Sequence, residues 1–224
     1  MKKIKQIIAL GIIVMLQCTM LGQTPTETRK FQDAESTEIL KNLQKKLNSY
    51  TNISIDFVFK TEKNGKFVDE IKGITLIKGD KYVLQTPQQS IFCNGVNAWN
   101  YLPEQKEVTI SLYDKEDDSQ MFNPMSLIKN YEKEYKSNFI KEVMERGVLV
   151  QIIDLTSIKA TSFYKVRLVI NKAKNQIMRF TVYEKDGTQY TYNIDKFVVN
   201  QTLPDSRFVF DAAQYPNTEV IDIR

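Results

Sequence analysis

The stretch of sequence that decides the fold is GITLIKGDKYVLQTPQQSIFCNGVNAWNYLPEQKEVTI, residues 73–110. Its apolar runs are separated by the tight-turn pairs Gly79-Asp80 and Asn94-Gly95. Asn-Gly between apolar runs is the strongest short-range hairpin signal, because both residues accept the positive φ of a type I′ turn. Bulky apolar side chains recur here without an acid–base pair or a ligand cluster beside them. The stretch therefore predicts antiparallel strands whose surface holds an apolar ligand rather than reacts with it.

The same two-residue alternation extends along most of the chain, and Asn64-Gly65 and Asp186-Gly187 repeat the hairpin signal. We expect strands at about 53–60, 67–78, 81–86, 89–93, 96–102, 106–112, 138–144, 147–155, 162–170, 176–184 and 188–199, and a closing strand within 202–210. Strands at this spacing, without long helical crossovers, favour an antiparallel meander that curls toward a barrel. The predicted fold class is mainly β with α.

Two segments have helical rather than strand periodicity. The first is expected to begin near Ser36 or Thr37 and to end near Tyr50, and the second to begin at Asn123-Pro124. A curled sheet of ten to eleven strands has a concave face too wide for its own side chains to fill, so we expect these helices to cover it as a lid. The helix at 36–50 would face the sheet with Leu40, Leu43 and Leu47.

An apolar cavity between lid and sheet is one consequence of this arrangement, and a closed core is the other, because periodicity cannot separate the two. Met and aromatic side chains suit a cavity for flexible acyl chains. The predicted cavity residues are Phe57, Phe59, Leu76, Tyr82, Leu84, Trp99, Tyr101, Met121, Met125, Leu127 and Ile128. If Trp99 lines such a cavity, Trp99→Asp should remove binding more than stability.

The N-terminus reads as a targeting segment, with lysines before an apolar run too short to span a bilayer comfortably. We expect a signal peptide at 1–22, a linker at 23–35 and one domain at 36–224, in the periplasm. An uncleaved anchor and lipidation on Cys18 stay open as alternatives. Without its three lysines the net charge falls from +4 to +1, so nucleic acid is not an expected partner.

Residues for catalysis are scarce. The chain has no histidine, and Cys93 would be the single cysteine after cleavage, most simply a small buried thiol. No phosphate-binding, dinucleotide-binding or nucleophile-elbow motif occurs. We therefore expect no enzyme, cofactor or metal site, although an enzyme acting on a glycan or lipid remains the least supported alternative.

The order of the motifs resembles a known family, the periplasmic outer-membrane lipoprotein carriers (LolA-like proteins). The family pattern Gly-x-Leu-x-Leu-x-Lys, an aromatic strand ending in Pro, and an Asn/Asp-Gly hairpin with Trp-x-Tyr correspond to Gly73–Lys78, Tyr82–Pro87 and Cys93–Tyr101. The closing Asp-x-x-Phe-x-Phe motif corresponds to Asp205–Phe210. The resemblance implies an unclosed β-barrel with a helical lid.

The implied activity is non-covalent shuttling of acylated lipoproteins, or other lipids, from the inner to the outer membrane. The implied partners are an inner-membrane lipoprotein-releasing transporter and an outer-membrane acceptor, and we expect a monomer. One departure is that Gly79 and Asp80 stand where the carriers have an Arg-Pro pair that helps to hold the lid shut, with Lys78 and Lys81 nearby. A lipidated outer-membrane receptor or envelope-stress sensor of the same fold is the alternative function.

Overall fold

The computed structural model describes residues 33–114, 128 and 131–224 and confirms a mainly β fold, with α1 (Ala34–Asn48) as its main helix. The first six strands are β1 (Ile53–Lys63), β2 (Lys66–Lys78), β3 (Lys81–Gln85), β4 (Ser90–Cys93), β5 (Asn97–Leu102) and β6 (Glu107–Leu112). The short helix α3 (Tyr131–Glu134) precedes β7 (Tyr135–Glu145), β8 (Val148–Ser157), β9 (Phe163–Asn171), β10 (Gln176–Glu184) and β11 (Thr188–Val199). The chain then forms the 3-10 turns η1 (Asp205–Phe208) and η2 (Ala212–Gln214) and the strand β12 (Glu219–Asp222).

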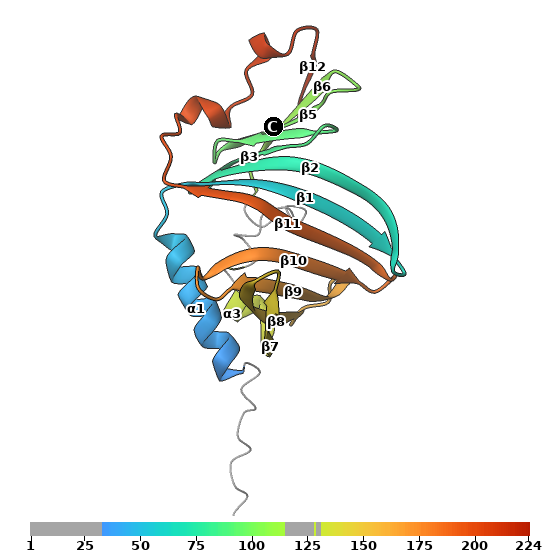
Figure 1. Cartoon of the computed structure of the whole chain (residues 1–224). Helices are drawn as coiled ribbons and strands as arrows, with labels where there is room; N and C mark the ends of the chain where they lie inside the picture. The colour runs from blue at the N-terminus through green and yellow to red at the C-terminus, as the bar shows by residue number, and fades with distance from the viewer. Residues whose placement is uncertain (1–32, 115–127, 129–130) are drawn as a thin grey trace, which may run out of the picture. The chain divides into compact units, whose positions relative to one another are not determined.

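All twelve strands belong to one sheet, in the order β12-β6-β5-β4-β3-β2-β1-β11-β10-β9-β8-β7 (Figure 1). Its end strands, β12 and β7, do not pair with each other, so the sheet is not closed. Neighbouring strands are antiparallel, except that β12 runs parallel to β6. The eleven strands expected between residues 53 and 199 are all present, as β1 to β11. The twelfth was not expected, because its four residues are too short a pattern to stand out.

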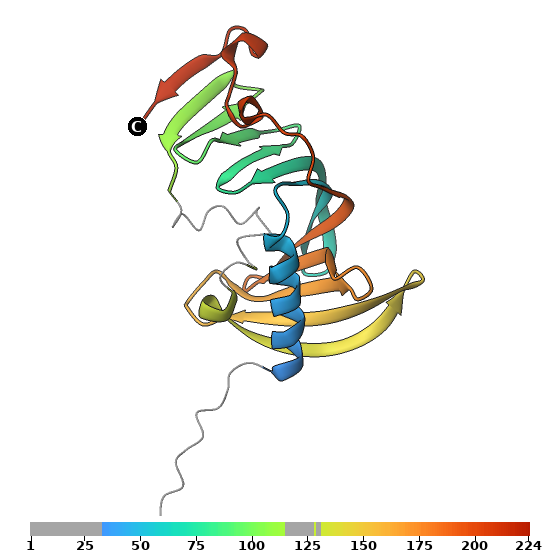
Figure 2. The same cartoon turned by 90° about the vertical axis from the view of Figure 1, so that its left-hand side faces the viewer.

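The strand pairing defines two faces of the sheet, which we call inner and outer. Paired residues share a face, and alternate residues of a strand lie on opposite faces. The inner face is the one covered by α1 (Figure 2), and Ile53, Ile55 and Phe57 of β1 lie on it in one core cluster with the helix. On the helix side, Leu40 and Leu43 are completely buried. Each such side chain contributes about 1.5–3 kcal/mol by leaving water, so α1 is bound firmly to the sheet.

Asp33, rather than Ser36 or Thr37, caps α1, so the helix begins inside the segment expected to be a linker. Its carboxylate accepts hydrogen bonds from the backbone N–H groups of Ser36 (3.2 Å) and Glu35 (3.3 Å). The same carboxylate accepts from the N–H of Phe139 (3.0 Å), and the Asp33 N–H donates to the carbonyl of Ser137 (3.3 Å). One residue therefore caps the helix and fixes it to strand β7.

The hydroxyl of Ser36 has another partner, so Ser36 does not cap the helix as expected. Its hydroxyl is completely buried and lies 2.8 Å from the hydroxyl of Ser137, which is 101 residues away in the sequence. Burial raises the pKa of the Asp33 carboxyl, but the N–H donors of Phe139, Ser36 and Glu35 outweigh this effect and leave the pKa below its usual value. The charged form is thus the one that the fold stabilises.

We predict that Asp33→Ala lowers the free energy of unfolding by about 1–2 kcal/mol, the upper range for loss of a helix cap, because Phe139 also loses its acceptor. Urea denaturation measures this change. Asp33→Asn is the control, since Asn caps a helix as well as Asp does. Because the folded-state pKa is lowered, the contribution of the charge is present above the unfolded pKa and is lost as pH falls through the folded one. Equal stability of Asp33→Ala and the parent would contradict the prediction.

The turns confirm the predicted hairpins but not the predicted turn type in every case. Asn64 and Gly65 both have positive φ, as a type I′ turn requires, and so do Arg146 and Gly147. At Asn94-Gly95 only the glycine has positive φ, since β4 and β5 are joined by a longer loop. Its Asn94 side chain accepts hydrogen bonds from two backbone N–H groups two and three residues further on.

Gly73 lets a strand and an aromatic ring approach closely. It pairs with Phe57 across β1 and β2, and the ring of Phe57 lies over its Cα. A Cβ atom at position 73 would lie 2.4 Å from Cζ of Phe57 and 2.9 Å from the carbonyl oxygen of Gln85. The first residue of the family motif is therefore needed for packing between neighbouring strands.

We predict that Gly73→Ala lowers the free energy of unfolding by about 1–3 kcal/mol, the usual cost of overpacking a core. Thermal and urea denaturation measure it. In the background of Phe57→Leu the same substitution should cost less, because the nearest clashing atoms are gone. A full cost in both backgrounds would show that the ring of Phe57 is not the obstacle.

The closing strand expected within 202–210 is wrong. The segment is irregular and contains η1, and Pro204 stands immediately before that turn. Proline has no N–H to give to a sheet ladder, and a residue before proline is restricted as well. Phe208 and Phe210 are nevertheless buried, because the segment lies across the outer face of the sheet.

Candidate functional site

The inner face carries a continuous group of aromatic rings on β1, β10 and β11. Phe59 stacks on Tyr190 with ring centroids 5.7 Å apart and lies 4.6 Å from Tyr192. Tyr192 also stacks on Phe180 at 4.4 Å, and Phe57 lies 5.9 Å from it. Burial raises the pKa of Tyr192, so its hydroxyl stays neutral. Phe57 and Phe59 therefore lie on the face that the helix covers.

This inner face continues onto β3 and β4. Leu84 pairs with Ile91, and Tyr82 pairs with Cys93, on the same side as Ile77 and Thr75 of β2. Leu84 is buried in the core cluster of α1, whereas Tyr82 and Ile91 are half-buried. The predicted cavity residues Tyr82 and Leu84 thus extend the apolar surface away from the helix.

Ile128 and Tyr131 pack against the sheet together with α1 and form hydrogen bonds to it. Both side chains are buried, with exposed fractions of 1% and 0%. The carbonyl of Ile128 accepts a hydrogen bond from the side chain of Gln44 (3.3 Å), and the hydroxyl of Tyr131 donates to the carbonyl of Thr37 (3.5 Å). Burial raises the pKa of Tyr131. Ile128, one of the predicted cavity residues, and Tyr131 therefore belong to the buried core beside α1.

Leu76, Trp99 and Tyr101 lie on the outer face, so the prediction that they share one cavity with Phe57 needs correction. The pairing runs from Leu76 through Val83 and Phe92 to Trp99, on the side opposite Leu84. In β4 both phases of the alternation contain apolar residues, Phe92 in one and Ile91 in the other, and in β5 each phase contains an Asn, so the pattern cannot show which phase faces the helix.

Met121, Met125 and Leu127 lie outside the described residues. Whether any of the eleven predicted residues contacts an acyl chain stays a prediction. The three predicted lid residues Leu40, Leu43 and Leu47 are all buried against the inner face.

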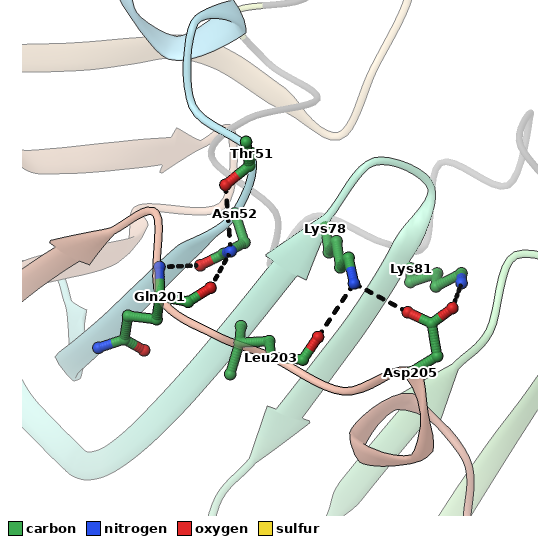
Figure 3. Close-up of polar contacts among 7 residues, drawn as sticks. All are labelled: Thr51, Asn52, Lys78, Lys81, Gln201, Leu203 and Asp205. Carbon is green, nitrogen blue, oxygen red and sulfur yellow. Dashed lines mark hydrogen bonds and ion pairs between the residues drawn. The ribbon is translucent and has the colours of Figure 1, made fainter.

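The outer face is covered by residues 201–215, which we call the C-terminal strap. Its start is held by Asn52, whose side chain is buried (Figure 3). The Asn52 amide donates to the carbonyl of Gln201 (2.7 Å), and its side-chain oxygen accepts from the N–H of Gln201 (3.0 Å). The strap therefore leaves the sheet in a fixed direction.

A cluster of two lysines and one aspartate holds the next part of the strap (Figure 3). Lys78 donates to Asp205 (2.9 Å) and to the carbonyl of Leu203 (3.0 Å), and Lys81 donates to Asp205 (2.6 Å). Lys81 and then Lys78 lower the pKa of the Asp205 carboxyl. The two lysines beside Gly79-Asp80 thus bind the strap on the outer face.

Beyond this cluster the strap is held by aromatic packing. Phe210 stacks on Tyr215 at 4.7 Å, and Tyr215 lies 4.5 Å from Tyr101 of β5. Phe92 of β4 contacts the ring of Phe210 edge-on at 5.9 Å. Tyr101 therefore has a packing partner on the outer face, and Trp99 packs against the same cluster.

Two of the hollows among the described residues can be compared with the apolar cavity that we expected, and both differ from it. One, of about 680 Å³, lies between α1 and strands β7 to β10 and has a polar lining. The other, of about 470 Å³, is lined by residues of β1 to β3 and by Asp195. Of the predicted cavity residues, only Phe57 lines either of them. The side chains of α1 and the inner face pack against each other instead.

Among the described residues, no three His, Cys, Asp or Glu side chains are placed to hold a metal ion. Cys93 is buried, as expected, and is a free thiol whose pKa is raised by burial. Within the same part of the chain, no helix has the length and apolarity to cross a membrane.

The described residues define a fold class, an unclosed and mostly antiparallel sheet with a helix on one face. The family model described as "Outer membrane lipoprotein carrier protein LolA" matches residues 48–211, and the chain belongs to this family. The family is described as one of carriers rather than enzymes. A search of curated proteins found no relative with significant sequence similarity.

The chain is similar to several solved structures. An uncharacterized conserved protein from Thermus thermophilus superposes with a TM-score of 0.57 at 13% identity, over 84% of this chain and 99% of that one. A putative outer membrane lipoprotein-sorting protein domain from Vibrio parahaemolyticus gives 0.46 at 13% identity, over 78% and 96%. A LolA superfamily protein from Nitrosomonas europaea gives 0.43 at 14% identity, over 79% and 98%.

We predict that Asp205→Asn loosens the C-terminal strap, because Lys78 and Lys81 lose their charged partner. Backbone amides of residues 203–215 should exchange about two- to fivefold faster, as expected for an exposed ion pair, while those of α1 stay unchanged. Hydrogen exchange followed by NMR measures this. In the parent protein the stabilisation is present above the unfolded pKa and lost as pH falls through the lowered pKa of Asp205.

Asp195→Asn is the matched control for this prediction. It removes another exposed carboxylate, from β11, that takes no part in the contacts of the strap described above. If amide exchange in the strap increased equally in both variants, the lysine–aspartate cluster would have no specific role.

Proposed function

We propose that the protein is a periplasmic carrier that binds the acyl chains of lipoproteins on its inner face and shuttles them from the inner to the outer membrane. Membership of the lipoprotein-carrier family is the observation that carries this proposal. The apolar inner face, with its half-buried residues Tyr82, Ile91 and Phe59, supports it. Each acyl methylene that leaves water contributes about 0.8 kcal/mol, so part of one chain is enough to hold cargo.

Entry of an acyl chain requires some movement of the cover, because α1 and the inner face are packed together. The polar contacts that join α1 to Ile128 and Tyr131 include hydrogen bonds of 3.3 and 3.5 Å. Hydrogen bonds of this kind contribute about 0.5–1.5 kcal/mol each. A cover that opens at a cost of a few kcal/mol allows loading and release to be reversible.

The partners of such a carrier are an inner-membrane transporter that loads it and an outer-membrane acceptor that receives the cargo. The most direct test is gentle purification from the envelope followed by lipid mass spectrometry, together with uptake of a fluorescent fatty-acid probe. Co-purified lipoprotein or lipid and saturable probe uptake are the expected results. Recovery of empty protein that takes up no probe would overturn the proposal.

We predict that Ile91→Asp and Trp99→Asp have different effects on acyl binding. Both side chains are half-buried, but Ile91 lies on the inner face and Trp99 on the outer. Ile91→Asp should weaken probe binding at least about tenfold, or 1.4 kcal/mol, because a charge would face the acyl chain. Trp99→Asp should lower stability and leave binding unchanged, which replaces our expectation from the sequence.

Fluorescence titration of the probe and urea denaturation of each variant separate binding from folding. Equal loss of binding in both variants at equal stability would place the ligand elsewhere. Labelling cells with a palmitate analogue checks the location: a label lost in Cys18→Ala would indicate an anchored receptor or sensor instead of a free carrier.

A further inference from the structure

The polar hollow beside α1 is a groove that runs along the helix and across the strands. One wall is the side of α1 that carries Glu38, Asn42 and Lys45, at helical spacing. The other wall consists of Glu142 of β7, Gln151 of β8 and the turn after β9, where Lys172 lies. Its volume of about 680 Å³ is enough for several residues of an extended peptide.

The two ends of this groove carry opposite charge. Glu35 and Glu38 lie at the beginning of α1, whereas Lys45 and Lys46 lie in its last turn. On the opposite wall Glu142 is paired with Lys172 at 2.6 Å, so these charges largely compensate each other. The uncompensated pattern is therefore acidic at one end of the helix and basic at the other.

The length of the groove sets the spacing of charges in a complementary ligand. Glu38 and Lys45 are seven residues apart, which corresponds to about 10 Å along a helix. An extended polypeptide covers this distance in about three residues. Between the two ends, Asn42 and Gln151 supply side-chain amides of the kind that a peptide backbone requires; the Gln151 Nε2 also donates to Glu142 (2.9 Å).

Beyond the polar wall of the groove lie two exposed apolar side chains. Met144 and Leu149 form the pair that follows Glu142 and Gln151 along the β7–β8 hairpin on the same face. Their exposed fractions are 60% and 38%. The backbone N–H of Lys172 donates to the carbonyl of Leu149 (3.0 Å), which keeps this pair beside the basic end.

We propose that this groove binds an extended polypeptide segment in which a basic and an acidic side chain stand three to four residues apart. The basic side chain lies beside Glu35 and Glu38, and the acidic one beside Lys45 and Lys46. In one respect the inference rests on the proposed function: the segment belongs to the protein part of the acylated cargo. The groove then holds the polypeptide while the apolar inner face holds the acyl chains.

An acyl-free peptide tests the groove separately from lipid binding. The probe is a fluorescein-labelled peptide of sequence Gly-Ser-Lys-Gly-Ser-Glu-Gly-Ser, and Gln replaces both charged residues in the reference peptide. We expect the charged peptide to bind at least fivefold more tightly than the reference in fluorescence anisotropy. NMR shift changes should be confined to α1, the β7–β8 hairpin and residues 172–175.

The variant K45E/K46E should weaken binding of the charged peptide at least tenfold and should bind better when Lys replaces the Glu of the peptide. The control K66E/K185E makes the same charge change at two exposed sites, one at the start of β2 and one in the turn after β10, and should leave binding unchanged. Equal weakening by both variants, or no shift changes in α1, would overturn the proposal. If the protein takes up no fatty-acid probe but still binds the charged peptide more tightly than the reference, the carrier function is refuted and the peptide groove is not.

Discussion

The pairing of β1 with β11 is the contact on which the rest of the structure depends. It joins eleven residue pairs, from Ile53 with Val199 to Lys63 with Thr188, across most of the length of the domain. β1 also pairs with β2, so this one strand links the hairpins of β2 to β6 with those of β7 to β11. Hairpins form from local turns, but this long-range pairing brings both halves under the same helix, because α1 packs on side chains from each.

Strand positions could be predicted from the sequence because they depend on local chemistry. Alternation and turn residues located β10 and β11 with their observed bounds, Gln176–Glu184 and Thr188–Val199. The face of each residue was harder to predict. Where one phase of a strand is polar, as at Asp56 beside Phe57, the inner side is evident; where both phases are apolar, as at Phe92 and Cys93, it is not. Because of this ambiguity, Trp99 and Tyr101 were predicted to share a cavity with Phe57, which lies on the other side of the sheet.

Long-range contacts explain the remaining differences between prediction and structure. Ser36 has the local sequence of a helix cap, but Ser137, far along the chain, occupies its hydroxyl and Asp33 becomes the cap instead. Phe208 and Phe210 have strand-like alternation, yet the segment follows Pro204 and is held by Lys78 and Lys81 through Asp205. A sequence pattern shows what a segment favours alone, and distant side chains decide between alternatives of similar energy.

This chain has Gly79 and Asp80 where the carriers have an Arg-Pro pair, and these contacts show what the neighbouring lysines do. Lys78 and Lys81 flank the turn at Gly79-Asp80 but act on the outer face, where they hold the C-terminal strap. The cover of the inner face depends on other interactions: the buried leucines of α1 share one core cluster with Ile128 and Tyr131, and two long hydrogen bonds add to this packing. Each buried leucine contributes more than either hydrogen bond. In the proposed carrier, therefore, α1 stays on the sheet as part of the core, and cargo enters where the inner face is only half-buried, at residues such as Tyr82 and Ile91.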